Sequence, residues 1–112
     1  MFNWEKKIYI AKRNVLVNSK GQEIPYYDEP LQYMFNVQPA SGDTDIIEYG
    51  EKISKIFKAI VHIKYKGMIN EGDIAWIDGA LPNDTKDNYN YTVVSVRNQN
   101  RRIAIYFERI QK

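Results

Sequence analysis

The sequence predicts a mainly β protein, a small antiparallel β-barrel or sandwich with long loops. Three observations lead to this fold class: short stretches with apolar residues at every second position, polar turn sequences between them, and an aromatic content of 13%. Aromatic residues are common in strands and at protein interfaces, because a rigid ring buries much apolar area. With 112 residues, the chain is expected to form a single domain, 1–112.

The amino-terminal part combines a strand pattern with a long exposed segment. Residues 7–17 carry apolar side chains at every second position in two stretches, which predicts a strand interrupted near Asn14. An Asn-Ser-Lys-Gly turn sequence follows. Pro25 and Pro30 then disfavour a helix or a central strand, because proline has no amide hydrogen to donate. We therefore expect an extended, exposed arm or loop over about 18–32.

A β core is expected over about 33–110. It opens with a strand that Pro39 ends, and a polar loop over 40–45 follows. Period-two alternation places three apolar residues on one face of this strand, namely Tyr33, Phe35 and Val37.

Residues 46–65 fit two different structures. Apolar residues at helical spacing within 53–60 favour a helix at 51–58, whereas the β-branched residues of 59–63 favour a strand. We predict one long strand across roughly 52–65, with the helix at 51–58 as the alternative.

Strand patterns are clearer in the second half of the chain. Alternation predicts strands over 74–77, 91–97 and 102–108, a polar loop over 81–88 and a four-residue hairpin loop, 98–101. In the last strand one parity holds Ile103, Ile105 and Phe107. This pattern predicts an antiparallel pair with one buried face.

The sequence offers no candidate catalytic, metal-binding or cofactor-binding residues. It contains no cysteine and one histidine, His62, which its β-branched neighbours place on a strand surface. The acidic residues lack the spacing of a calcium loop, and no glycine-rich phosphate motif occurs. We therefore expect a protein that is not an enzyme and uses no cofactor.

The sequence also contains no membrane signal. No apolar run approaches the ~20 residues that span a bilayer, and the charged start is unlike a signal peptide. We expect synthesis in the cytoplasm and no contact with membranes.

Lysines recur at even positions between 52 and 66, so a strand would place them on one side. A basic strip of this kind can contact a phosphate backbone. Glu48 and Glu51 lie close by in the sequence and favour an ordinary solvated face instead, and the net charge of +2 is modest for a dedicated nucleic-acid binder. The basic residues concerned are Lys52, Lys58, Lys64 and Lys66.

Four stretches of the chain resemble the small head–tail connector proteins of tailed bacteriophages, also called head-closure or adaptor proteins. The stretches are 35–45, 48–52, 69–79 and 91–96, followed by the closing hairpin. The resemblance covers roughly residues 33–110, and it consists of turn and strand patterns, without a catalytic signature.

The resemblance implies a structural role in the virion, after synthesis in the cytoplasm of a bacterial host. It implies a ring of copies that binds the portal and the tail, keeps packaged DNA in the capsid and makes at most weak, non-specific DNA contact through channel-facing lysines. The candidate contacts with other subunits or with the portal lie on the arm and on the loop near 80–90, at Tyr26, Tyr27, Leu81 and Tyr89.

Two other functions fit the same sequence. One is a tail-completion protein or another tail interaction module, because similar small β folds serve that role. The other is a small OB-like barrel that binds single-stranded nucleic acid by stacking bases on aromatic side chains.

Overall fold

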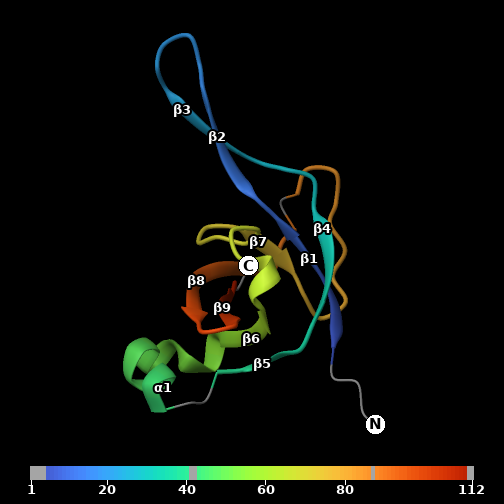
Figure 1. Ribbon diagram of the computed structural model, residues 1–112. Coiled ribbons are helices and arrows are strands. Elements are labelled where there is room, and N and C mark those ends of the chain that lie inside the picture. Colours follow the sequence, from blue (N-terminus) through green and yellow to red (C-terminus); the bar gives the residue numbers. More distant parts are fainter. Residues whose placement is uncertain (1–4, 41–42, 87, 111–112) are drawn as a thin grey trace.

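The computed structural model describes residues 5–40, 43–86 and 88–110. Seven strands form one antiparallel sheet that curls into a half-barrel, and two further strands form a separate hairpin (Figure 1). The predicted mainly β, antiparallel, barrel-like fold is confirmed. In chain order the elements are β1 (Lys6–Ala11), β2 (Arg13–Val17), β3 (Glu23–Tyr27), β4 (Leu31–Phe35), β5 (Val37–Pro39), α1 (Asp43–Tyr49), the 3-10 helix η1 (Gly50–Lys55), β6 (Ile56–His62), the 3-10 helix η2 (Ile63–Tyr65), β7 (Ile74–Trp76), β8 (Tyr91–Gln99) and β9 (Arg102–Arg109).

The curl of the sheet follows from the path of the chain between β4 and β5. The strand order is β4-β1-β7-β8-β9-β6-β5, so β4 and β5 lie at opposite ends of the sheet. β4 pairs with β1, where Tyr33 lies opposite Ile8. β5 pairs with β6, where Val37 lies opposite Ala59. Only Asn36 separates the two strands, and the chain across one residue can span no more than about 7 Å. The two ends of the sheet therefore lie close together.

The inner face of the half-barrel holds the main hydrophobic core. The predicted shared face of Tyr33, Phe35 and Val37 is confirmed, because all three are buried in this core. The rings of Tyr33 and Phe35 stack with centroids 5.1 Å apart. The predicted apolar parity of the last strand also points into the same core, through Ile103, Ile105 and Phe107.

The outer face of β9 is buried too, so the expectation of one buried face is wrong. Ala104 and Tyr106 are 0% and 3% exposed. They form a second cluster with Ile56, and Tyr49 and Ile53 pack against it. These last two side chains come from α1 and η1, so the helical segment covers a face that the parity of β9 alone would assign to solvent.

The predicted strand over 52–65 is also wrong in its extent. Only β6 is extended, and η1 and η2 flank it as 3-10 helices. The alternative, a helix at 51–58, is right for the η1 residues alone. The predicted polar loop over 40–45 overlaps the start of α1, and its residues 41 and 42 lie outside the described part. Gly50 has φ +53, a left-handed conformation that ends α1. None of the helices in the described residues has the length and apolar composition to cross a membrane.

The β8–β9 hairpin is tighter than the predicted four-residue loop, 98–101. Gln99 still pairs with Arg102, so the turn contains only two residues. One of them, Asn100, has φ +45, which asparagine adopts more readily than most residues in a two-residue hairpin turn.

Candidate docking surface on the projecting hairpin

Among the described strands, β2 and β3 pair only with each other, and they stand away from the half-barrel (Figure 1). Their pairs run from Arg13 opposite Tyr27 to Val17 opposite Glu23. We call this hairpin, residues 13–27, the arm. With the arm included, the molecule measures 51 Å in its longest dimension and 32 and 30 Å in the other two.

The arm differs in two respects from the segment predicted over 18–32. It is a regular two-stranded ribbon that starts at Arg13, and the break in the first strand falls at Lys12 instead of Asn14. The amide of Asp28 donates to the carbonyl of Lys12 at 2.9 Å, which closes the base of the ribbon. The proline at position 25 is compatible with β3, because each strand of an isolated hairpin has a free edge.

Both faces of the arm carry exposed apolar side chains. Residues directly opposite each other in an antiparallel pair project to the same face. By the register, one face carries Leu16, Ile24 and Tyr26, and the other carries Val15, Val17 and Pro25. Their exposure runs from 38% for Tyr26 to 66% for Val17 among the large side chains. An isolated hairpin is marginally stable in water, and a contiguous exposed apolar patch is typical of an interaction site.

A feature of the sequence that period-two alternation does not consider could have predicted this apolar surface. Val15, Leu16 and Val17 are three consecutive apolar residues. Adjacent residues of a strand project to opposite faces, so such a run in a two-stranded ribbon exposes apolar side chains on both sides.

The root of the arm is held to the half-barrel by Asp73. One carboxylate oxygen accepts from the amide of Arg13 at 3.1 Å, and the other accepts from the amide of Asn70 at 2.9 Å. The side chain is buried, and this burial raises the pKa of Asp73 above its usual value. Because the hydrogen bonds join the first arm residue to the turn before β7, the arm projects from a fixed base.

Two of the four predicted contact residues are half-buried and pack against each other. The rings of Tyr27 and Tyr89 lie 6.3 Å apart, and Tyr89 lies 6.5 Å from the buried Trp76. The Trp76 ring nitrogen donates to Asn88 Oδ1 at 2.7 Å. The structure therefore brings Tyr27 and Tyr89 together as a half-buried aromatic cluster between the arm root and the loop that follows β7.

The other two predicted contact residues are exposed. Tyr26 is 38% exposed on the arm, and Leu81 is 65% exposed in the loop after β7. The side-chain amide of Asn88 donates to the Leu81 carbonyl at 2.8 Å, so the backbone of this loop is held in place. Lys86 Nζ lies 3.7 Å from Glu29 Oε1, which joins the loop to the chain just after the arm.

The predicted basic strip is divided in the structure. Lys58 Nζ lies 3.0 Å from the buried Asp45, so its charge is compensated. Lys52 is on η1 and Lys64 is on η2, at opposite ends of β6, because the segment is not one continuous strand. Lys64 and the exposed Lys66 are two residues apart and stay together.

Asp45, Lys58 and Tyr106 form a buried polar cluster that fastens α1 to the sheet. The Tyr106 hydroxyl donates to Asp45 Oδ1 at 2.8 Å. Burial first, and then the hydrogen bond to the carboxylate, raises the pKa of Tyr106 to about 12. Arg97 stacks over the Tyr106 ring at 4.8 Å and forms an ion pair with Glu48 on α1. These contacts all join the helical segment to β6, β8 and β9.

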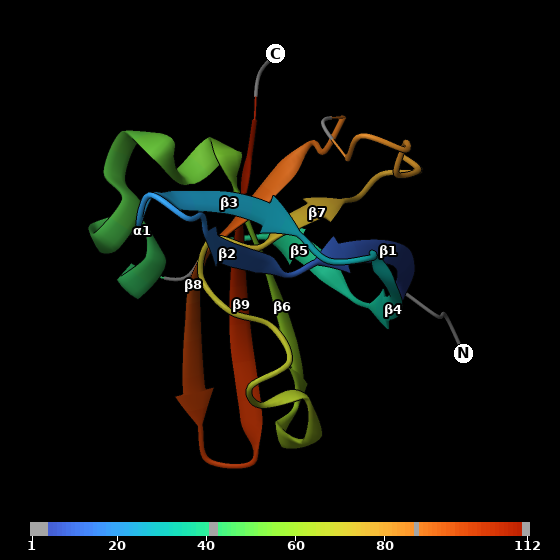
Figure 2. The same ribbon diagram turned by 90° about the horizontal axis from the view of Figure 1, so that it is seen from above.

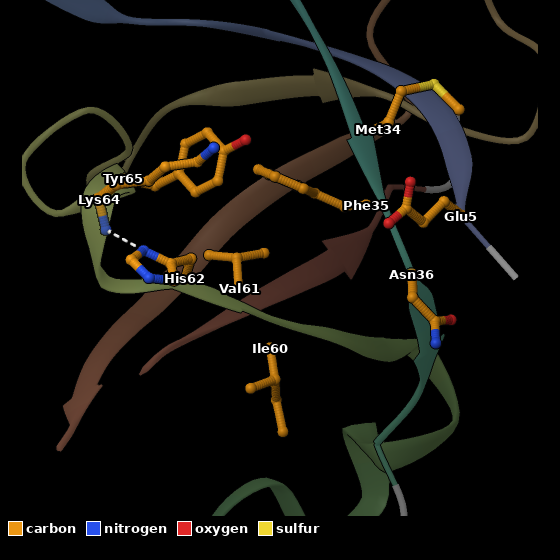
Figure 3. A pocket seen from close by; sticks show the side chains of 9 residues that line it. All are labelled: Glu5, Met34, Phe35, Asn36, Ile60, Val61, His62, Lys64 and Tyr65. Atoms are coloured by element: carbon orange, nitrogen blue, oxygen red, sulfur yellow. Dashed lines mark hydrogen bonds between the residues drawn. The ribbon is translucent and has the colours of Figure 1, made fainter. Parts of the chain in front are cut away.

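A groove of about 270 Å³ opens between β4 and the end of β6 (Figure 3). Pairing between β5 and β6 stops at Ala59, so 60–62 has no strand neighbour on this side in the described residues. Figure 3 shows the rings of Phe35 and Tyr65 on the same side of β6 as Val61, and Ile60 on the other side. The groove is lined by Glu5, Met34, Phe35, Asn36, Ile60, Val61, His62, Lys64 and Tyr65.

Two polar side chains of this groove accept local hydrogen bonds. Asn36 Oδ1 accepts from the side-chain amide of Gln38 at 3.2 Å. His62 Nδ1 accepts a hydrogen bond from the Lys64 amide at 3.0 Å. Across residues 5–40, 43–86 and 88–110, no three His, Asp or Glu side chains lie close enough together to hold a metal ion.

Comparisons with known proteins bear on the fold alone. No protein-family model matches the chain, and no curated protein is significantly similar. Among solved structures, the chain is similar to the solution structure of protein SF1141 from Shigella flexneri 2a. The TM-score is 0.63 at 11% sequence identity, and the alignment covers 93% of this chain and 90% of the other. The two proteins therefore have a similar fold over most of both chains, despite very different sequences.

Proposed function

We propose that this protein is a non-enzymatic structural component of a tailed-phage particle. In this proposal it is a head–tail connector that binds the portal and the tail and keeps packaged DNA in the capsid. The observation that carries the proposal is the arm, which exposes apolar side chains on both of its faces. The stretches of sequence that resemble connector proteins support the same function.

An arm with two apolar faces needs a partner on each side. A hairpin with one apolar face could fold back onto its own half-barrel, whereas burial of both faces requires the arm to lie between two surfaces. In a ring, each copy contacts its neighbours through unlike surfaces, and such contacts close when the rotation between copies closes. In the proposed ring, the arm therefore packs between neighbouring copies of the chain.

A tail-completion protein is the second candidate, and it would use the arm in the same way. The two functions differ in the particle that the ring binds, heads or tails. The OB-like alternative is less well supported, because most aromatic side chains of the described residues pack against each other and are not available to stack on bases.

The experiment is co-sedimentation of the purified protein with portal-bearing, DNA-filled capsids that lack tails. The wild-type protein is expected to bind and to keep the DNA inside. The double substitution Leu16→Ser and Tyr26→Ser removes apolar contact from one arm face and is expected to weaken binding by at least about tenfold. Its thermal unfolding should match that of the wild type, because both side chains are exposed.

The matched control is Ile47→Ser on α1, which is 84% exposed and far from the arm in the sequence. It should bind capsids as the wild type does. Binding to isolated tails but not to capsids would establish the tail-completion function instead. Binding to neither particle would refute both functions, and equal binding of the arm variant and the wild type would refute the role of the arm.

A further inference from the structure

Four exposed cationic side chains from two distant parts of the sequence meet at one end of the half-barrel. The pairing of β6 with β9 ends with His62 opposite Arg102. The amide of Ile63 then donates to the carbonyl of Arg101 at 3.1 Å. This contact places η2 and the residues after it beside the β8–β9 turn, at the bottom of Figure 2. We call Lys64, Lys66, Arg101 and Arg102 the basic end.

The charges of the basic end are not compensated in the described part of the chain. All four side chains are exposed, and the ion pairs found among the described residues involve other cations, Lys6, Lys58, Lys86 and Arg97. Two carboxylates share a hollow with these cations: Glu5 lines the groove with Lys64, and Glu71 lines a hollow with Lys66. Two carboxylates are too few to compensate four cations.

The basic end makes the molecule electrically asymmetric. The chain contains 16 Lys and Arg and 14 Asp and Glu. Without the four cations of the basic end, 12 Lys and Arg remain against those 14 carboxylates. The net charge of +2 is therefore the sum of four cations at the basic end and an excess of two carboxylates over the rest of the chain. A local concentration of positive charge attracts polyanions.

We propose that the basic end binds the phosphate backbone of double-stranded DNA without sequence specificity. Arginine side chains recognise phosphate with a planar fork of donors, and lysine contributes a mobile point charge. The two arginines are adjacent in the chain, and the two lysines are two residues apart. The two pairs lie on two turns that can approach neighbouring phosphates. The site differs from the basic strip expected from sequence, because it excludes Lys52 and Lys58 and adds Arg101 and Arg102.

The surroundings of the basic end favour duplex over single-stranded DNA. Single strands are held largely by stacking of bases on exposed aromatic rings. The ring nearest this site is Tyr65, which is half-buried and packs edge-on against Phe35 at 5.1 Å and Tyr33 at 5.9 Å. Lys64 Nζ lies 5.2 Å from the centre of the same ring, so this ring is not a free stacking platform.

This inference rests on the proposed function for its biological setting, because a head–tail connector would contact the packaged double-stranded DNA. The binding of DNA by the basic end can be tested without the phage particle.

Binding can be measured on the free protein with a labelled random-sequence duplex, by fluorescence anisotropy over a range of salt concentrations. If all four cations contact phosphates, the plot of log K against log salt should have a slope of about −3.6. Failure of this experiment would leave capsid binding through the arm untouched.

The test variant is Arg101→Glu with Arg102→Glu, and the matched control is Lys52→Glu with Lys55→Glu on η1. Both variants change the net charge equally. The test variant should bind at least tenfold more weakly at low salt, with a slope reduced by about 2, and the control should stay within about twofold. Arg101→Gln with Arg102→Gln should show a smaller loss in the same direction, and it replaces the charge reversal if that variant does not fold.

Three results would overturn the inference. The first is the absence of salt-dependent duplex binding by the wild-type protein. The second is an equal loss in the test variant and the control, which would indicate attraction by net charge without a defined site. The third is tighter binding of a single strand of the same length, which would assign the site to another ligand.

Discussion

Tyr106 shows how a single hydroxyl group can join two elements of this protein. Its hydroxyl donates to Asp45 of α1, and its ring lies in the outer cluster between the sheet and the helical segment. Burial and the neighbouring carboxylate both disfavour the ionised phenolate, so the folded state favours the neutral hydroxyl.

The stability of the protein should fall in alkali because of this residue. The pKa of Tyr106 rises from 10.0 to about 12 on folding, so its contribution to stability is complete below pH 10 and is lost as the pH rises towards 12. Tyr33, Tyr49 and Tyr91 also have raised pKa values, which act in the same direction. Urea unfolding at several pH values measures the effect.

The substitution Tyr106→Phe measures how much of the alkaline loss of stability is due to Tyr106. Tyr106→Phe should lower the free energy of unfolding by about 2 kcal/mol at neutral pH, because it loses one hydrogen bond to a charged group. It should also show a smaller loss of stability between pH 10 and 12. Tyr26→Phe, on the exposed arm, is the control and should behave as the wild type does. An unchanged alkaline loss in Tyr106→Phe would contradict the assignment.

Among the elements, the arm depends on its root. The two-stranded ribbon has no hydrophobic core of its own. A hydrogen bond from the Arg13 amide to Asp73 attaches it to the half-barrel, and a hydrogen bond from the Asp28 amide to the Lys12 carbonyl closes its base. Tyr27 contributes apolar contact at the same place, against Tyr89. The arm therefore presents its apolar side chains in a defined direction, although its strands form a sheet separate from the half-barrel.

Removal of the Asp73 side chain should loosen this root. Asp73→Ala leaves the amides of Arg13 and Asn70 without their acceptor, which should cost about 2 kcal/mol of stability. The loss is reduced by relief from burying an ionised carboxylate, which the raised pKa of Asp73 indicates. Hydrogen exchange at the Arg13 amide should become faster. Asp84→Ala, on an exposed loop, should change stability by less than about 0.5 kcal/mol. Equal exchange at Arg13 in Asp73→Ala and the wild type would contradict this role.

At the scale of the whole molecule, two regions of unequal stability are joined. The half-barrel buries side chains on both faces of β9, whereas the arm buries little on either face. Local opening is easiest where few apolar contacts are lost.

Hydrogen exchange of the free protein should differ between the half-barrel and the arm. Amides of β6, β8 and β9 should be the most protected, and those near the arm tip should exchange at close to the unprotected rate. The arm amides should gain protection in the presence of capsids. Strong protection of the arm tip in dilute free protein would contradict an uncovered arm, and a concentration-dependent gain would indicate self-association.

Period-two alternation identified the residues that face the core in β4, β5 and β9. This works because the pleat of a strand turns successive side chains to opposite faces, whatever the neighbouring strand is. Alternation was less informative in β8, because a bulge between Val93 and Ser95 shifts the register. After the bulge, the positions that face the core are even-numbered instead of odd-numbered.

The sequence by itself determined the mainly β fold class, the inward faces of several strands and the presence of an exposed segment near its two amino-terminal prolines. Only the tertiary structure decided that β4 and β5 lie at opposite ends of one sheet, that α1 and η1 cover the outer face of β9, and that Arg101 and Arg102 join Lys64 and Lys66. The physical reason is that alternation and turn chemistry act between residues close in the chain. Strand neighbours, covered faces and surface charge clusters depend on packing between distant segments, which no local pattern encodes.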